Sequence, residues 1–370
     1  MKALLPLLLL PVFCFANDGA FRVNGNQLIP MYETDISVRK EILAIKRIAD
    51  RQAQITVYYE FFNPKDDKTI EVGFEAYSPA GDVDATPRAD GQPYIDRFTV
   101  NLNGANVPWK VALVRDKSYY REGKIKAITL AQATKEVEDA SFFYVYHFKA
   151  LFRKGLNILT HTYTVDLSSS VVEHYSLLYV LTAAKRWANR QIDDFTLQIE
   201  MGDIQELVIP RSFFSHAAEW TMTGSGKSFD RPYSREEYDS VDKADFFVRS
   251  GGLVFKKTNF RPDGELSIVC PSQYTYYSKT LGKHTGDGEV KFDSRVDSLS
   301  FSVEDVYVGQ ASDELSKKIL HNLPFARRGY IFKSREIQAY YSRQPWYMPD
   351  PGYVPDESKL TQDERTLLKR

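Results

Sequence analysis

The chain has 370 residues, with 48 Lys and Arg against 49 Asp and Glu, and a formal net charge of −1. A balance this close to neutral argues against a polyanion binder such as a nucleic-acid protein. The length is sufficient to bury ordinary hydrophobic cores without disulfide staples, and only 2 cysteines are present.

Residues 1–16 have the pattern of a cleavable secretory signal peptide. Lys2 precedes an apolar run from Leu4 to Val12, and Cys14 and Ala16 place small residues before a cut after Ala16. The run is too short to span a bilayer, and no later stretch approaches about 20 apolar residues, so no transmembrane segment is expected in the mature chain. We therefore expect export, with the protein periplasmic, on the outer surface or secreted.

The two cysteines leave one alternative open at this end of the chain. A lipoprotein would use Cys14 as its acylated residue, but the bulky Phe13 precedes it, where lipoprotein processing needs a small residue. Cleavage after Ala16 leaves only Cys270, which ends the alternating apolar positions Leu266 and Ile268. We interpret Cys270 as a buried strand residue rather than a reactive thiol.

Residues 17–273 are predicted to form a β-rich body of antiparallel strands, as a sandwich or a barrel-like sheet, in one or two subdomains. Aromatic and branched residues alternate there in short runs bounded by turn residues, which is typical of strands. The expected strands lie at residues 55–61, 70–76, 98–102, 109–113, 142–152, 158–167, 175–181, 195–201, 253–260 and 265–270.

Turn residues predict how these strands connect. Asn103-Gly104 predicts a hairpin between residues 98–102 and 109–113, because both residues tolerate positive φ. Pro262-Asp263-Gly264 predicts a second hairpin between residues 253–260 and 265–270. Residues 124–138 predict one short helix, and residues 223–242 predict a long surface loop rich in Ser, Gly and charge.

Residues 298–370 are predicted to form a small helical domain, joined to the body by residues 274–297 as a linker or edge segment. Ser312 can cap a first helix, whose apolar stripe is Leu315, Ile319 and Leu323. Pro324 predicts a break or kink followed by one further turn.

Two further helices are expected in this domain. Gly329 fits the left-handed residue just past the first helix end. Ser334 can cap a second helix that ends before Pro345. Thr361 and Glu364 have the spacing of a capping box for the last helix.

Residues 324–332, followed by Gln344-Pro345-Trp346-Tyr347, resemble the YARHG domain. That domain is named for a Tyr-Ala-Arg-His-Gly run, here Phe325-Ala326-Arg327-Arg328-Gly329. The resemblance covers about the last fifth of the chain. It implies a bacterial extracellular module with no assigned chemistry, which elsewhere accompanies peptidase and kinase domains.

This copy departs from the family run at two positions. Phe325 replaces Tyr and loses a hydroxyl group, and Arg328 replaces His with a permanent charge. A proton-transfer role that depends on His is therefore not expected here.

The body carries a second, more diffuse resemblance. Residues 17–20 and 36–41, together with Asn63-Pro64 and Gly73-Phe74-Glu75, look like an uncharacterised secreted bacterial domain often paired with YARHG. None of these residues is diagnostic of chemistry, so this resemblance implies a β-rich body and no enzyme class.

The candidate interaction residues come from the motif, and two interpretations stay open. In the first, an Arg stacks on Trp346 and the aromatic residues fill a small core. In the second, Arg328, Tyr330, Trp346 and Tyr347 form a surface patch for a glycan, a peptide or an acidic envelope component. The complete set of candidates is Phe325, Arg327, Arg328, Gly329, Tyr330, Trp346 and Tyr347.

Residues 221–228 imitate a phosphate-binding loop around Gly224, Gly226 and Lys227. Thr221 replaces the leading Gly of that motif, the preceding segment is too short and polar for a buried strand, and the sequence after Ser228 does not begin a helix. We interpret the segment as a loop and expect no bound cofactor.

Other constellations give weak signals for catalysis or metal binding. The histidines lack metal-ligand spacing, no Gly-x-Ser-x-Gly elbow is present, and the acidic loop at Asp82, Asp84 and Asp90 lacks the Gly and Glu of a calcium hand. Two acidic pairs, Asp193 with Asp194 and Glu200 with Asp203, would serve hydrolysis only if they faced one cleft. We expect no catalytic, cofactor-binding or metal-binding residues.

The sequence therefore favours an exported, non-catalytic binding or assembly protein of the cell envelope. Its expected partner is an envelope protein, a peptide or a glycan. The alternative is an accessory hydrolase that acts on peptide or cell-wall substrates.

Overall fold

The structure, a computed structural model, describes residues 28–30, 35–115, 119–121, 124–135, 142–234, 241–272, 291–302 and 311–368. The expected signal peptide and residues 274–290 of the expected linker lie outside the described residues. The predicted domain boundaries therefore stay predictions.

The largest sheet of the body has eight strands. All neighbours in it pair antiparallel except β14 and β2, which run parallel. In spatial order the strands are β16 (Trp220–Met222), β19 (Leu253–Phe260), β14 (Ile192–Glu200), β2 (Ser37–Ala49), β3 (Gln52–Asn63), β11 (Gly155–Asp166), β5 (Ile95–Leu102) and β6 (Ala105–Asn106).

Two smaller sheets contribute to the same core. The six-stranded sheet has the order β12 (Ser168–Ser170), β13 (Glu173–Tyr179), β20 (Leu266–Pro271), β15 (Gln205–Pro210), β18 (Lys243–Ser250) and β17 (Ser225–Arg231). The four-stranded sheet has the order β1 (Leu28–Pro30), β4 (Lys68–Ala76), β10 (Phe143–Phe152) and β7 (Lys110–Val114). A short ribbon, β8 (Tyr120–Arg121) with β9 (Lys124–Ile125), lies apart from them.

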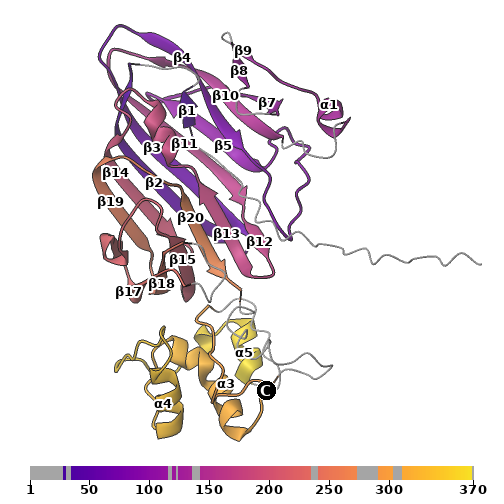
Figure 1. The fold of residues 1–370 in the computed structure, drawn as a ribbon, viewed down its shortest axis with the longest axis vertical. Coiled ribbons are helices and arrows are strands. Elements are labelled where there is room, and N and C mark those ends of the chain that lie inside the picture. Colours follow the sequence, from indigo (N-terminus) through magenta and orange to yellow (C-terminus); the bar gives the residue numbers. More distant parts are fainter. Residues whose placement is uncertain are drawn as a thin grey trace, which may run out of the picture.

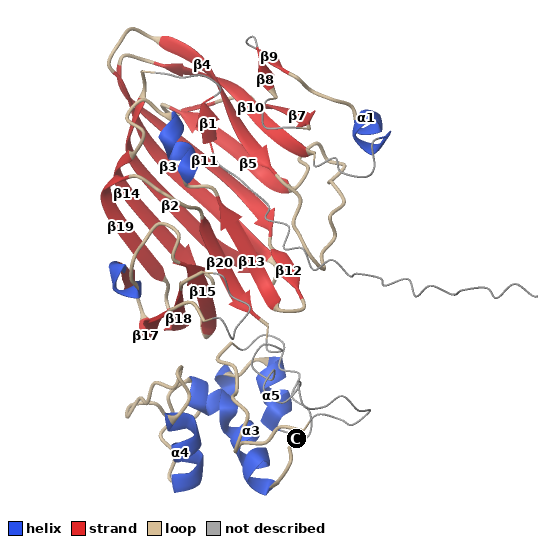
Figure 2. Cartoon of the chain, viewed as in Figure 1, coloured by secondary structure: helices blue, strands red, loops and turns tan. Residues whose placement is uncertain are grey.

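The core of the body follows from the alternation of side chains along each strand. In β3, Ile55, Val57, Tyr59 and Phe61 are buried, while the residues that alternate with them are only half-buried. One hydrophobic cluster joins the buried faces of all three sheets. The prediction of a mainly β chain with a small C-terminal helical region is confirmed (Figure 2).

For two predicted hairpins, the predicted pairing of strands is wrong. Asn103-Gly104 does turn the chain back, but onto the short β6, and β7 pairs with β10 in another sheet. β19 and β20 also lie in different sheets, so Pro262-Asp263-Gly264 joins two sheets rather than two paired strands. Alternation predicts that a segment is a strand, but it does not say which strand pairs with it.

The expected loop at residues 223–242 is also partly wrong. Residues Ser225–Arg231 form β17, which pairs with β18. Polar residues are common on an edge strand, so the composition misled the loop prediction. The expected helix within residues 124–138 is present as α1 (Leu130–Lys135). The described part of the body also has two short 3₁₀ turns, η1 (Thr182–Arg186) and η2 (Ala217–Glu219).

The C-terminal helices lie beside the end of the body at which β15, β17 and β18 are found (Figure 1). They are α3 (Glu314–Arg327), α4 (Arg335–Ser342) and α5 (Gln362–Leu368), with a 3₁₀ turn η4 (Glu357–Lys359) before α5. We call this part the helical domain. The first cap is Asp313 rather than Ser312, since the Asp313 side chain accepts from the amide of Ser316. α3 continues through Pro324 for one further turn.

Candidate functional site

The motif begins at the C-terminal end of α3, where Gly329 has the left-handed conformation that the sequence predicts, with φ of 94°. The amide of Gly329 donates to the carbonyl of Ala326, and the amide of Tyr330 donates to that of Phe325. This pattern is a Schellman cap. A Cβ atom on Gly329 would lie 2.6 Å from the carbonyl oxygen of Met348, so glycine is required by both conformation and space.

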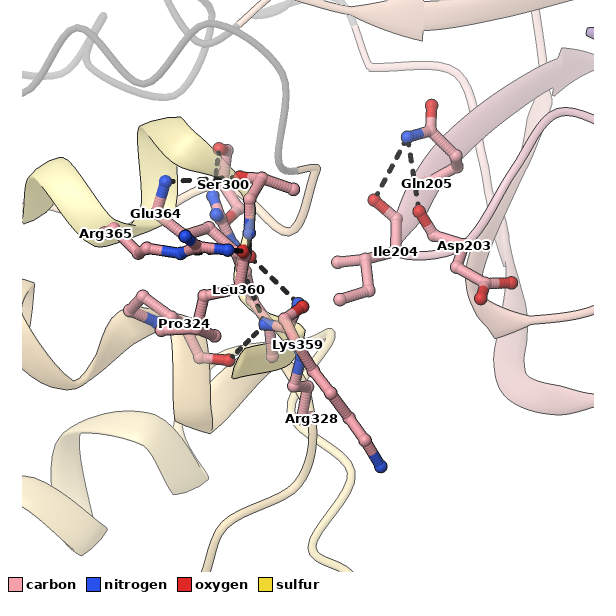
Figure 3. Close-up of polar contacts among 12 residues, drawn as sticks. Asp203, Ile204, Gln205, Ser300, Pro324, Arg328, Lys359, Leu360, Glu364 and Arg365 are labelled. Carbon is pink, nitrogen blue, oxygen red and sulfur yellow. Dashed lines mark hydrogen bonds and ion pairs between the residues drawn. The ribbon is translucent and has the colours of Figure 1, made fainter. Parts of the chain in front are cut away.

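Arg328 joins the C-terminal end of α3 to α5 (Figure 3). Its guanidinium forms a bidentate pair with Glu364, at 2.6 and 2.9 Å, and also donates to the carbonyl of Pro324 at 2.8 Å. Glu364 is completely buried and forms the predicted capping box with Thr361. Arg328 therefore closes α5 onto the end of α3.

Arg327 and Trp346 bind one buried segment, Leu299–Ser302, which we call the strap. Arg327 is 1% exposed, and its Nη2 donates to the carbonyl of Ser300 at 3.0 Å. Trp346 is also 1% exposed, and its Nε1 donates to the carbonyl of Leu299 at 2.6 Å. Carbonyl groups of the strap thus accept hydrogen bonds from both side chains.

Tyr330 and Tyr347 belong to the same hydrophobic cluster as Trp346. Phe325 is buried, Tyr330 is half-buried, and the hydroxyl of Tyr347 donates to the carbonyl of Tyr330 at 2.6 Å. The ring centroids of Trp346 and Phe301 lie 5.8 Å apart. The structure thus places Arg327 and Trp346 on the strap and Arg328 on Glu364, and the role of the seven candidates toward a partner stays a prediction.

The strap also reaches the body. β15 and β20 pair at the single register Val208 to Val269. Beyond it, the amide of Glu206 donates to the hydroxyl of Ser302 at 2.9 Å, and the same hydroxyl lies 3.7 Å from the sulfur of Cys270. The strap therefore satisfies a β15 amide that has left the sheet ladder. Cys270 is a buried strand residue, as predicted.

Two cations from the body hold the loop that follows Trp346. Lys227 on β17 donates to the carbonyl of Tyr347 at 3.0 Å, and burial lowers the pKa of this lysine. Arg249 on β18 donates to the carbonyl of Met348 at 3.0 Å and pairs with Asp350 at 3.4 Å. Lys227, the lysine of the apparent phosphate loop, thus binds a backbone carbonyl.

Body side chains complete the core of the helical domain. Ile204 and Phe247 belong to the hydrophobic cluster that contains Ile319, Tyr341 and other residues of the helices. Ile204 has φ of 53°, which is rare for a β-branched residue and costs about 1–3 kcal/mol. A strained residue is thus held where the two parts of the chain meet.

The surface of the eight-stranded sheet carries a second feature. Leu156 and Ile158 alternate with the buried Asn157, so both point outward from β11, and they are 56% and 40% exposed. Phe62 lies directly opposite Leu156 on β3, and the guanidinium carbon of Arg39 lies 5.2 Å from its ring centroid. We call Arg39, Phe62, Leu156 and Ile158 the outer patch.

The His and carboxylate groups considered for catalysis lie apart in the described part of the body. His147 pairs with Glu71 and His216 with Asp230, each on a different part of the body, and His284 lies outside the described residues. Asp193 and Asp194 bind Arg39 and Lys40 separately. Within the described ranges, no three His, Cys, Asp or Glu side chains gather as a metal site.

Three buried titratable groups were not predicted from the sequence. Burial raises the pKa of Glu41 to about 8 and lowers that of His161 to about 3. The pKa of Glu206 is raised to about 8, mainly by burial and secondly by the negative charge of Asp245. The positive charge of Arg231 lowers it, but by less. The alternation of β2, β11 and β15 gave a signal for all three, because each lies at an inward or covered strand position.

Comparison with protein families shows that residues 308–370 form a YARHG domain. Comparison with curated proteins gave no match. The part of the chain that the structure describes contains no helix with the length and apolar character needed to cross a membrane.

Three solved structures illustrate what this chain is similar to. A proposed nutrient-binding protein of Legionella pneumophila is 17% identical, with a TM-score of 0.49 over 94% of this chain and 96% of that one. Baculovirus P35 is 11% identical, with a TM-score of 0.27 over 66% and 99%. An M1 zinc metallopeptidase of Deinococcus radiodurans is 10% identical, with a TM-score of 0.26 over 65% and 43%. At these scores the likenesses carry no conclusion about ligand or activity.

Proposed function

We propose that this chain, a β-rich body that carries a YARHG domain, is a non-catalytic binding or assembly protein of the cell envelope. The leader-like residues 1–16 support export through a cleavable signal peptide, and the resemblance of the motif to an extracellular module supports the same location. The mature protein is then periplasmic, on the outer surface or secreted.

The outer patch is the observation that carries the binding function. Leu156 and Ile158 are exposed side by side on a rigid strand, and Phe62 extends the apolar surface onto the next strand. Large apolar residues that cluster on a surface mark interaction sites more often than scattered ones do. Sites on strands are also held more precisely than sites on loops.

The chemistry of the patch favours a protein or peptide partner. Its exposed groups are mainly aliphatic, whereas sugar rings are bound best by aromatic faces. The cations in and beside the patch already form ion pairs: Arg39 with Asp193 at 2.9 Å, and Lys40 with Asp194 at 2.9 Å. A partner that presents apolar side chains and little net charge therefore fits this surface better than an acidic polymer does.

The motif has a different role in this proposal. Arg327 and Trp346 hold the strap that reaches the body, and Arg328 holds α5 on the end of α3. Residues whose polar groups bind the same chain contribute to partner binding indirectly, because they keep the body and the helical domain in one arrangement.

A matched pair of variants tests the proposal. Leu156→Asp places a charge in the patch, and Val172→Asp places the same charge at an exposed turn between β12 and β13. Wild-type and variant mature proteins are immobilised, and proteins retained from envelope extracts are quantified by mass spectrometry. We expect Leu156→Asp to lower recovery of specific partners at least tenfold, and Val172→Asp to leave it unchanged.

Two results would contradict the proposal. Equal recovery by wild type and Leu156→Asp would remove the patch from the binding function. New cleavage products from peptidoglycan or a peptide library, formed by the purified mature protein, would instead support the hydrolase alternative.

A further inference from the structure

Two buried carboxyl groups lie where the helical domain meets the body. Glu206 on β15 and Asp245 on β18 are 3% and 5% exposed. Phe247 lies directly opposite Glu206 and packs on Phe301 of the strap, with ring centroids 5.5 Å apart. Since Glu206, Asp245 and Phe247 share one face of the sheet, the strap and the helical domain cover that face.

Glu206 faces one negatively and one positively charged side chain on other strands of its sheet. Asp245 on β18 and Arg231 on β17 face it, and Arg231 is committed to Asp245 at 3.1 Å. The strap contributes the uncharged Ser302, whose hydroxyl accepts from the backbone amide of Glu206. Lys227 and Arg249 lie on the same sheet face, but they donate to carbonyl groups of the helical domain. Among the described residues, Arg231 thus faces both carboxyl groups, and both are buried where the strap and the helical domain cover the sheet.

We propose that docking of the helical domain onto the body is linked to protons through Glu206. The Glu206 side chain carries a proton while the strap and helical domain cover it, and it loses that proton when they move away and water reaches the carboxyl group.

The direction of the pH dependence follows from the two states. Covered, Glu206 has a pKa of about 8, and in water its ordinary value is 4.5. Between these values the docked state holds one more proton than the open state, so rising pH favours opening. The opening equilibrium should increase about 50-fold from pH 6 to pH 8, and it should change little above pH 9.

Hydrogen–deuterium exchange of the full mature chain measures this equilibrium directly. Protection of amides in the strap and in residues 346–350 is followed from pH 6 to pH 9, after correction for the intrinsic rate of exchange. Glu206→Gln keeps the shape of the side chain and removes the titration. Glu41→Gln is the matched control, because Glu41 is buried on β2 opposite Tyr59 of the body core, away from the helical domain, with a pKa of about 8.

The expected result is a loss of protection at the strap with rising pH in the wild type and in Glu41→Gln, and a flat profile in Glu206→Gln. If Glu206→Gln does not fold, Glu206→Met replaces it. The inference is overturned if wild-type protection at the strap is independent of pH, if Glu206→Gln keeps the wild-type slope, or if Glu41→Gln abolishes it.

Discussion

Gly329 shows how tightly a single residue constrains the motif. Its φ of 94° and the nearby carbonyl of Met348 both exclude a side chain. We expect Gly329→Ala to lower the free energy of unfolding by about 2 kcal/mol, measured by urea titration. Gly352→Ala is the control, since its nearest contact would be at 3.4 Å. Equal stability of the two variants would show that the Schellman cap does not require glycine.

His161 is a residue whose polarity is unused in the fold. Its ring lies between those of Tyr59 and Tyr163, with centroids at 6.0 and 5.9 Å, and its nitrogens have no hydrogen-bond partner in the described chain. We expect His161→Phe to raise the free energy of unfolding by about 1–2 kcal/mol at pH 7, because no polar group is then buried without a partner.

The gain from His161→Phe should grow as the pH falls. The folded state keeps a pKa of about 3 against an ordinary 6.5, so below about pH 6.5 the unfolded wild type takes up a proton that the folded protein does not. Urea titrations at pH 5 and pH 7 measure this difference. A lower free energy of unfolding for His161→Phe than for the wild type would contradict this expectation, because it would mean that the imidazole stabilises the fold.

At the scale of elements, the ion pair of Arg328 with Glu364 stabilises the packing of α5 on α3. Arg328→Ala leaves the carboxylate of Glu364 buried without its cation, so we expect a loss of about 3 kcal/mol and release of α5 to proteolysis. Arg328→Lys should give an intermediate loss, because an ammonium group cannot form the bidentate pair.

An exposed pair provides the comparison for this prediction. Arg295 binds Asp293 at 2.7 Å but is 70% exposed, so Arg295→Ala should cost at most about 1 kcal/mol. Similar losses for Arg295→Ala and Arg328→Ala would show that the Arg328–Glu364 pair does not hold the helix.

The elements differ in how much of them the sequence predicts. Alternation placed β3 and β11, and local capping patterns placed Gly329 and the Thr361–Glu364 box, because these signals depend on neighbours in the chain. The pairing of β19 and β20 was wrong, since both alternate in the same way and the choice of sheet depends on the whole body.

The candidate site was predicted only in part for the same reason. The motif residues were found from the sequence, but Ser300 and Ser302 carry no local signal for a strap. Lys227 and Arg249 bind backbone carbonyls that are about a hundred residues distant in the chain. Only the assembled fold brings such partners together.

At the scale of the whole molecule, stability should fall as pH rises from about 5 to about 8. Glu41 and Glu206 both have raised pKa values of about 8 in the folded protein, so the stability that their protonated forms provide is complete below about pH 4.5 and is lost as the pH rises through 8. The expected slope is about 1 kcal/mol per pH unit for each group. Urea titrations of the wild type, Glu41→Gln and Glu206→Gln test it: unchanged slopes in both variants would exclude these carboxyl groups as the cause.

The helical domain is held on the body through the strap, which Arg327 and Trp346 bind, and through the two cations Lys227 and Arg249. Hydrogen–deuterium exchange of the mature chain tests this most directly, by comparing the wild type with a Lys227→Ala, Arg249→Ala double variant and with the exposed-site control Lys256→Ala. We predict that the double variant loses at least tenfold protection in the strap and in residues 346–350, while β3 keeps its protection in all three proteins. Unchanged protection in the double variant would contradict the account.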